Sequence, residues 1–374
     1  MTSELVFALW TIAPPSCAAF AALKRRSPAL AITHARQSML VLRPVHGAPS
    51  HLEEAALSSR AAGTHARIRF LASENDAVAQ AALAPIVKAL TEEGFDAAIT
   101  VTGAKAGNPK VVQLAHAEGI HFSSDTSRVL IVDADVVLTG SLVQALDAAM
   151  TTGSHIAWAA PVERTSKTPA DYASRAVLCT SLHAFPLLAR LDEGGMVGKC
   201  FLTTAATVRM LGGFSSLAMV LGEDMELAER ARRAGLRVSC VTFPATSALS
   251  GRTLREVFQR YVRWLLVIRH QRPHLLLSYP ALFFAYPLQL LVACFVPHGI
   301  LLAVIATVAR MLVATLATAA SGEPLRPRDI VFLPAGDVLL LAAFAGAVFG
   351  VETRWGKERL RFDARGYLRT EGST

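Results

Sequence analysis

The sequence has few cysteines, and none of them lies in a pattern typical of a zinc site or a disulfide framework. The five cysteines of the 374-residue chain are scattered, and no CxxC pair occurs. Because those sites need closely patterned cysteines, the sequence predicts neither of them. We therefore expect reduced cysteines in a protein that faces the cytosol and a membrane.

Charge is missing from long apolar stretches at both ends of the chain. Charged residues make up 18% of the sequence, yet residues 5–23 and 275–296 contain none, and residues 299–320 contain only Arg310. About 20 apolar residues span a bilayer as a helix. We therefore predict membrane helices at both ends of the chain.

The basic residues predict which side of the membrane each part faces. Lys24, Arg25 and Arg26 follow the first apolar stretch, whereas a cleaved signal peptide would carry such charges before it. The positive-inside rule then places the N-terminus outside and the following residues in the cytoplasm. The net charge of +8 is concentrated late in the chain beside apolar segments, which favours a membrane over nucleic acid as the partner.

A third apolar stretch, residues 330–351, raises a problem of parity. It is interrupted by Pro334 and Asp337, and a run of basic residues follows it. Three crossings after a cytoplasmic domain would leave that basic tail outside, against the positive-inside rule. We therefore predict that this stretch is re-entrant, interfacial or split.

The middle of the chain alternates between strand-like and helix-like patterns. Alternating elements of this kind predict an α/β fold with a mostly parallel sheet. The expected strands include residues 39–42, 68–71, 99–102 and 129–132, and the expected helices include 77–90 and 141–149.

An Asp-x-Asp sequence, Asp133 and Asp135, follows the apolar strand 129–132. Side chains at the C-terminal end of such a strand project into the crevice where α/β sheets bind ligands. Two carboxylates there suit Mg²⁺ or Mn²⁺ bridging a diphosphate. The alternative interpretation is a polar turn.

Two further acids, Glu223 and Asp224, precede a predicted helix at 225–234. They either cap the helix, where negative charge is favoured, or direct one carboxylate into the cleft as a general base.

A third motif holds Arg260, Arg263 and Trp264, which share one face of a predicted helix. Two guanidinium groups and an indole are suited to a diphosphate leaving group and an acceptor. The surrounding segment, 253–270, is basic and amphipathic, so it is also predicted to rest on a membrane surface.

A loop that begins at Lys105 and ends at Lys110 contains a Gly-Asn-Pro turn. Its lysines could meet phosphate oxygens as point charges, or simply be solvated.

Taken in order, these motifs resemble the family 2 type glycosyltransferases with the D, D, D, (Q/R)xxRW signature. The chain is most similar to their ceramide glucosyltransferase branch, which includes bacterial and hopanoid-associated relatives. The resemblance covers residues 38–290, with a looser likeness around 354–356. The closer likeness rests on Val41–Gly47, Lys105–Lys110, Gly198–Cys200 and Arg260–Trp264.

The resemblance implies a GT-A nucleotide-binding domain with a mostly parallel mixed sheet, plus N-terminal and C-terminal transmembrane helices. It implies an N-terminal membrane anchor at 1–26 and a cytoplasmic catalytic domain at 27–250. An interfacial helix with the RxxRW motif would follow at 251–273. Membrane segments at 274–351 and a basic cytoplasmic tail at 352–374 would complete the chain.

The resemblance also implies a role for each matching residue. Asp224 would be the catalytic base with Glu223 beside it, and Asp135 would ligate Mg²⁺ or Mn²⁺. Arg260, Arg263 and Trp264 would bind the diphosphate and close the site. The residues expected to contact the nucleotide sugar are Arg43, Pro44, Lys105, Asp133 and one of Glu74 or Asp76, and His183 is a further candidate.

The expected activity is inverting transfer of a hexose from a UDP-sugar, with UDP-glucose as the first choice, to ceramide or a similar membrane lipid. The alternatives are transfer to a hopanoid or other lipid, a processive polysaccharide synthase and a polyprenyl-phosphate sugar transferase. An alternative without activity is a degenerate membrane scaffold.

Overall fold

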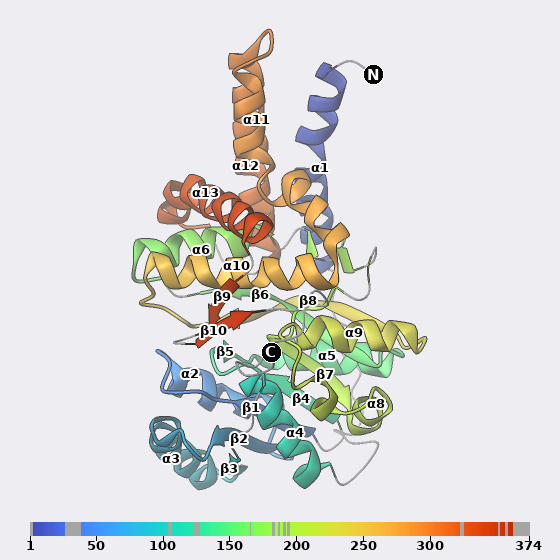
Figure 1. Cartoon of the computed structure of the whole chain (residues 1–374), viewed down its shortest axis with the longest axis vertical. Helices are drawn as coiled ribbons and strands as arrows, with labels where there is room; N and C mark the ends of the chain where they lie inside the picture. Colours follow the sequence, from blue (N-terminus) through green and yellow to red (C-terminus); the bar gives the residue numbers. More distant parts are fainter. Residues whose placement is uncertain are drawn as a thin grey trace. The chain divides into compact units, whose positions relative to one another are not determined.

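The computed structural model describes most of the chain as two compact units (Figure 1). The sheet unit comprises residues 29–161 and 191–249, and the helical unit comprises 1–28, 162–190 and 250–361. The described residues are 3–26, 39–103, 107–122, 128–164, 166–181, 184–185, 188–189, 192, 195–321, 325–350, 352–355 and 358–361.

An eight-stranded mixed sheet forms the sheet unit, in the order β3-β2-β1-β4-β7-β6-β8-β5. The strands are β1 (Met39–Pro44), β2 (Arg67–Ser73), β3 (Asp96–Thr102), β4 (Arg128–Val132), β5 (Val136–Val137), β6 (Ile156–Glu163), β7 (Cys200–Thr204) and β8 (Val238–Ser247). Strands β1 to β4 pair in parallel, whereas β7 runs antiparallel to β4. The predicted α/β fold with a mostly parallel mixed sheet is confirmed.

Helices connect these strands, as expected for parallel pairs, which need long crossover connections. They are α2 (Leu52–Leu57), η1 (Ser58–Ala62), α3 (Ala77–Glu92), α4 (Pro109–His121), α5 (Gly140–Thr151), α8 (Ala205–Met210), η2 (Phe214–Leu217) and α9 (Glu223–Arg233). The strand and helix predictions for residues 39–102 and 129–149 are confirmed.

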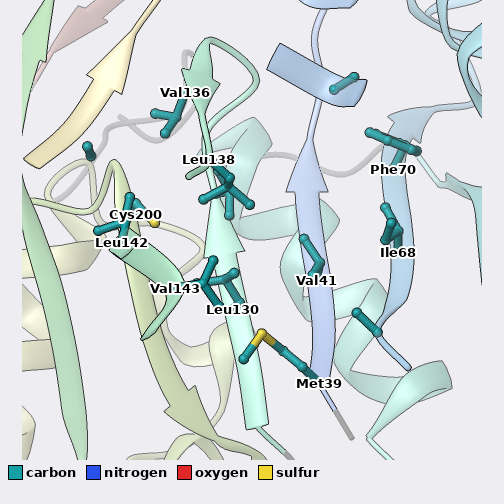
Figure 2. Packing of buried hydrophobic residues seen from close by; sticks show 14 of the residues in the cluster. Met39, Val41, Ile68, Phe70, Leu130, Val136, Leu138, Leu142, Val143 and Cys200 are labelled. Atoms are coloured by element: carbon teal, nitrogen blue, oxygen red, sulfur yellow. The ribbon is translucent and has the colours of Figure 1, made fainter. Parts of the chain in front are cut away.

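The apolar core of the sheet unit surrounds its central strands. All six residues of β1 are buried, which is typical of a parallel strand covered on both faces. Figure 2 shows Val41 of β1, Ile68 of β2 and Leu130 of β4 on neighbouring strands of this core. Leu142 and Val143 of α5 belong to the same cluster.

The helical unit contains the apolar stretches. Its elements are α1 (Ser3–Arg26), α6 (Pro169–Ser181), α10 (Leu254–Gln271), η3 (Pro273–Leu277), η4 (Tyr279–Phe283), α11 (Ala285–Ala293), α12 (Gly299–Ser321), α13 (Pro327–Phe349), β9 (Glu352–Trp355) and β10 (Glu358–Arg361). Among the described residues, α12 and α13 are long and apolar enough to cross a membrane. The stretch 275–296, predicted as a membrane helix, overlaps two helical pieces, Pro273–Phe283 and Ala285–Ala293, which are bent by 61° and together are long and apolar enough for one broken span or a re-entrant loop.

The third apolar stretch is a single helix, α13, although Pro334 lies inside it. It packs against α6 and α10, and the three helices run alongside one another in Figure 1, whereas α1 and α12 stand across them. A Cβ on Gly336 would lie 2.9 Å from the carbonyl oxygen of Ala173, so the close approach to α6 requires glycine. The stretch is therefore unbroken in the described residues, and its re-entrant or interfacial placement stays a prediction, because α13 is also long and apolar enough to cross a membrane.

Candidate active site

The Asp-x-Asp turn begins where β4 ends, as the sequence predicts. The amide of Val136 donates to the carbonyl oxygen of Asp133 at 3.1 Å, which closes the turn. The guanidinium of Arg43, fully buried in β1, donates to the carbonyl oxygens of Asp133 and Val136 at 2.9 and 2.8 Å. Burial lowers the pKa of Arg43 to about 10. Arg43 thus stabilises the backbone of the turn through two hydrogen bonds.

A lysine that immediately precedes the neighbouring strand β7 contacts both aspartates of the turn. Strands β4 and β7 pair so that Val132 faces Cys200, which brings Lys199 beside the turn. The Nζ of Lys199 donates to both carboxylate oxygens of Asp135 at 2.7 Å and lies 3.5 Å from Asp133. Ser247 of β8 also donates to the Asp135 carboxylate. Every carboxylate oxygen of Asp135 therefore accepts at least one hydrogen bond.

A second lysine, Lys110 at the start of α4, links the Asp-x-Asp turn to the acids of α9. Its Nζ lies 2.9 Å from Asp133 and 3.1 Å from Glu223. These charges, led by that of Asp133, raise the pKa of Lys110 above its ordinary value against the opposing effect of burial. Asn108 donates to the other Glu223 oxygen at 3.0 Å. The turn before α4 is therefore fixed against α9.

Asp224 occupies the first turn of α9 beside Glu223. Its carboxylate accepts hydrogen bonds from the amides of Gly198 and Met225. A Cβ on Gly198 would lie 2.7 Å from the Cβ of Asp224, so only glycine allows this approach. Burial among protein groups, followed by repulsion from Glu223, raises the pKa of Asp224 to about 7, although its side chain keeps partial exposure. A carboxylate with this pKa can accept a proton near neutral pH.

The cluster carries an excess of negative charge. Four carboxylates, Asp133, Asp135, Glu223 and Asp224, surround two ammonium groups, Lys110 and Lys199. Hard carboxylate oxygens with surplus charge are the donor set that Mg²⁺ or Mn²⁺ prefers. However, no group of three or more His, Cys, Asp and Glu side chains in the described part of the chain is arranged to hold a metal ion. The donor chemistry fits a divalent cation, but Lys199 holds the oxygens that it would need.

Glu74 and Asp76, the two acids that the sequence left as alternatives for contact with the nucleotide sugar, have different surroundings. Asp76 caps α3, and its carboxylate accepts from the amide of Gly47 at 2.7 Å and lies 3.1 Å from His46. It therefore ties the loop after β1 to the loop after β2. Glu74 is exposed at the end of β2, so it is the more accessible of the two acids. Pro44 is buried at the end of β1.

The RxxRW motif lies on α10 in the helical unit. Arg260 donates to Glu163 at 2.6 Å, and its guanidinium lies 4.9 Å from the Trp264 ring centre. Glu163 is fully buried, and its carboxylate also accepts hydrogen bonds from both terminal nitrogens of Arg252. The acidic partner raises the pKa of Arg260 despite its burial. In the helical unit, Arg260 is therefore an internal ion-pair partner, and Arg263 is partly exposed on the same helix.

The structure thus brings Asp133, Asp135, Glu223 and Asp224 together in the sheet unit, and Arg260 and Trp264 together in the helical unit. Lys105 and His183 lie outside the described residues. The sequence predicts no role for Lys199 or Ser247, and for Lys110 it predicts only a contact with phosphate oxygens or solvent, not the ion pairs with Asp133 and Glu223. Lys199 does lie within the quoted Gly198–Cys200 motif, which was the available signal.

The comparison with known families decides the class of the protein. The sequence model of the family described as glycosyl transferase family 21 matches residues 6–367 of this chain. The chain belongs to this family. The resemblance to the ceramide glucosyltransferase branch is confirmed, and the chain is a sugar-transferring enzyme. A search of curated proteins found no match.

Several solved structures are similar at low identity. A mannosyltransferase from Pyrobaculum calidifontis, solved with GDP-Man and Mn²⁺, is 14% identical, with 92% of this chain and 97% of that chain covered and a TM-score of 0.47. A mycobacterial protein is 16% identical, with 67% and 78% covered and a TM-score of 0.38. A 4-diphosphocytidyl-2C-methyl-D-erythritol synthase is 16% identical, with 62% and 100% covered and a TM-score of 0.33.

Proposed function

We propose that the enzyme transfers a hexose from a UDP-sugar, with UDP-glucose as the first choice, to the hydroxyl of ceramide or a similar membrane lipid. The observation that carries this proposal is Asp224, a carboxylate with a pKa of about 7 beside Lys110 and the Asp-x-Asp turn. A base, a cationic group and two further carboxylates are the components that a direct displacement at a sugar diphosphate needs.

In the proposed reaction Asp224 takes the proton of the lipid hydroxyl while that oxygen attacks the anomeric carbon. The bond from this carbon to the diphosphate oxygen breaks, and UDP leaves with the electron pair. Attack and departure on opposite faces invert the anomeric configuration. The amides of Gly198 and Met225 hold the Asp224 carboxylate for the proton transfer, and the charge of Glu223 helps to raise its pKa.

The donor is proposed to lie along the edge of the sheet where β1, β2 and β4 end. Parallel strands present their C-terminal ends at one edge, and open α/β sheets bind ligands there. Glu74 or Asp76 would meet the uridine, while Asp133 would contact the nucleotide sugar. Asp135, with Asp133, would hold Mg²⁺ or Mn²⁺, which would supply Lewis-acid neutralisation of the departing diphosphate.

The proposed setting is an integral membrane protein with several crossings and its catalytic domain in the cytoplasm. The support is the pair of long apolar helices, the bent pair at 273–293 and the basic residues Lys24, Arg25 and Arg26 at the end of α1. In this setting the diphosphate and acceptor would be closed in by Arg260, Arg263 and Trp264. Lys105 would approach the UDP.

The decisive experiment incubates the purified full-length chain with a panel of UDP-sugars and extracted lipids and identifies the product by mass. We expect one glycolipid, with no product from the Asp224→Asn variant, which should still bind UDP. A polymer product would indicate a polysaccharide synthase, and a product labile to mild acid would indicate a polyprenyl-phosphate transferase. Absence of both transfer and UDP binding would instead support a degenerate scaffold.

A further inference from the structure

Lys199 is held by the carboxylate that the proposed function assigns to a divalent cation. Its Nζ donates to both oxygens of Asp135 at 2.7 Å, and only 13% of its side chain is exposed. A Mg²⁺ or Mn²⁺ ion binds such oxygens at roughly 2.0–2.2 Å. Because a divalent ion on the same carboxylate would lie close to the Lys199 ammonium and repel it, the ion and Lys199 compete for Asp135.

The buried Asp135 carboxylate needs a positive charge beside it. Asp135 is 90% buried as a side chain, and Ser247 is its other side-chain donor among the described contacts. Without a cation, a buried carboxylate of this kind is costly. In the absence of the donor, the Lys199 ammonium therefore serves as the counter-ion of Asp135.

Arrival of a donor diphosphate changes this balance. It brings negative charge to a cluster that already holds two more carboxylates than ammonium groups. Lys110 is engaged by Asp133, Glu223 and the carbonyl oxygen of Gly198. Lys199, with its contacts on Asp135 and a longer one to Asp133, is the ammonium that a metal ion at Asp135 would release.

We propose that Lys199 moves from Asp135 to the donor diphosphate when the donor and its divalent cation bind, so that the ion enters with the nucleotide and not before it. The proposal rests on the proposed function, because it requires a nucleoside diphosphate donor. It assigns Lys199 two successive partners: the Asp135 carboxylate in the free enzyme and a phosphate oxygen in the complex.

The test compares Mn²⁺ binding to the detergent-solubilised full chain with and without UDP, using the electron paramagnetic resonance signal of free Mn²⁺. We expect wild-type protein to bind Mn²⁺ weakly alone and at least about tenfold more tightly with UDP, a change of about 1.4 kcal/mol. Lys199→Met should bind Mn²⁺ alone about tenfold more tightly than wild type, because its competitor is removed. The same variant should bind UDP about tenfold more weakly at saturating Mn²⁺, because the phosphate contact is lost.

Two further variants separate charge from folding. Lys199→Arg keeps a cation on Asp135, so its affinity for Mn²⁺ alone should stay at the wild-type level even if the methionine variant folds poorly. Lys88→Met removes a lysine whose side chain is 76% exposed on α3, and it should change neither affinity.

The outcomes distinguish the two proposals. If wild-type protein with Mn²⁺ fails to bind UDP, the proposed function fails. If UDP binds but Mn²⁺ alone binds wild type as tightly as it binds the wild-type UDP complex, the role of Lys199 is overturned. The same conclusion follows if Lys199→Met binds Mn²⁺ alone no more tightly than wild type does, or if Lys199→Arg, which keeps the cation, binds it more tightly than wild type.

Discussion

The pKa of Asp224 makes the proposed base testable through a single neighbouring charge. Glu223 is the second cause, after burial, of the rise in this pKa to about 7. Glu223→Gln removes the charge while keeping the size of the side chain and one oxygen for Lys110 or Asn108. The variant therefore perturbs the proton affinity of Asp224 with little change in packing.

The direction and size of the effect follow from electrostatics. A base must be ionised, so the transfer rate should fall about tenfold per pH unit below the pKa of Asp224. Without the neighbouring negative charge, Asp224 ionises more easily and its pKa falls. The pKa of Asp224 rises from 3.8 to about 7 with burial as the larger cause, so removal of the Glu223 charge should lower it by on the order of one unit, or about 1.4 kcal/mol.

The assay measures the initial rate of glycolipid formation from pH 5 to pH 9 at subsaturating acceptor. Wild type should reach its plateau above about pH 7, and Glu223→Gln should reach its own plateau at lower pH. Asp224→Asn should show no transfer at any pH while still binding UDP. An acid limb that stays in place or moves to higher pH in Glu223→Gln would refute the assignment of that limb to Asp224.

Three other variants test separate parts of the structure. Asp135→Ala should abolish the Mn²⁺ dependence of UDP affinity, as measured by titration with and without a chelator. Gly198→Ala should lower kcat by about 10²-fold with UDP affinity retained, because the new Cβ would lie 2.7 Å from the Cβ of Asp224 and displace its carboxylate. Glu163→Ala should destabilise the protein by about 3–5 kcal/mol, because it leaves the buried Arg260 without its acidic partner. Thermal unfolding followed by tryptophan fluorescence would show this loss, whereas an unchanged midpoint would contradict it.

The strands of the sheet unit were predictable because their physical signal is local. Strands β1 and β4 are short apolar runs buried on both faces, and their alternation with helices predicts parallel pairing. The position of Asp133 and Asp135 at the end of β4 follows from the same pattern. Capping, one of the alternatives for Glu223 and Asp224, is compatible with their site, since both lie in the first turn of α9.

The contacts of the two lysines could not be predicted in this way. Lys199 meets Asp135 only because β7 runs antiparallel beside β4 with Val132 opposite Cys200. Periodicity within a strand carries no information on which distant strand becomes its neighbour or in which register. The Arg260–Glu163 pair has the same origin, since the two residues are separated by 97 positions in the chain. A guanidinium in a recognised motif can thus serve the protein's own packing.

The helix α13 shows why hydropathy alone left the parity problem unsolved. Hydropathy counts Asp337 as a charge that interrupts a span, but the structure pairs it with Arg310 of α12 at 2.8 Å. Asp329 is likewise paired with Arg175 of α6 at 3.1 Å. Because both acids are neutralised by helices of the same unit, Asp337 is no argument against a crossing, and α13 is long and apolar enough to make one. The predicted interfacial placement of α13 would leave two crossings, the bent pair at 273–293 and α12, and the basic tail would then lie on the side of residue 250 onward, as the positive-inside rule requires.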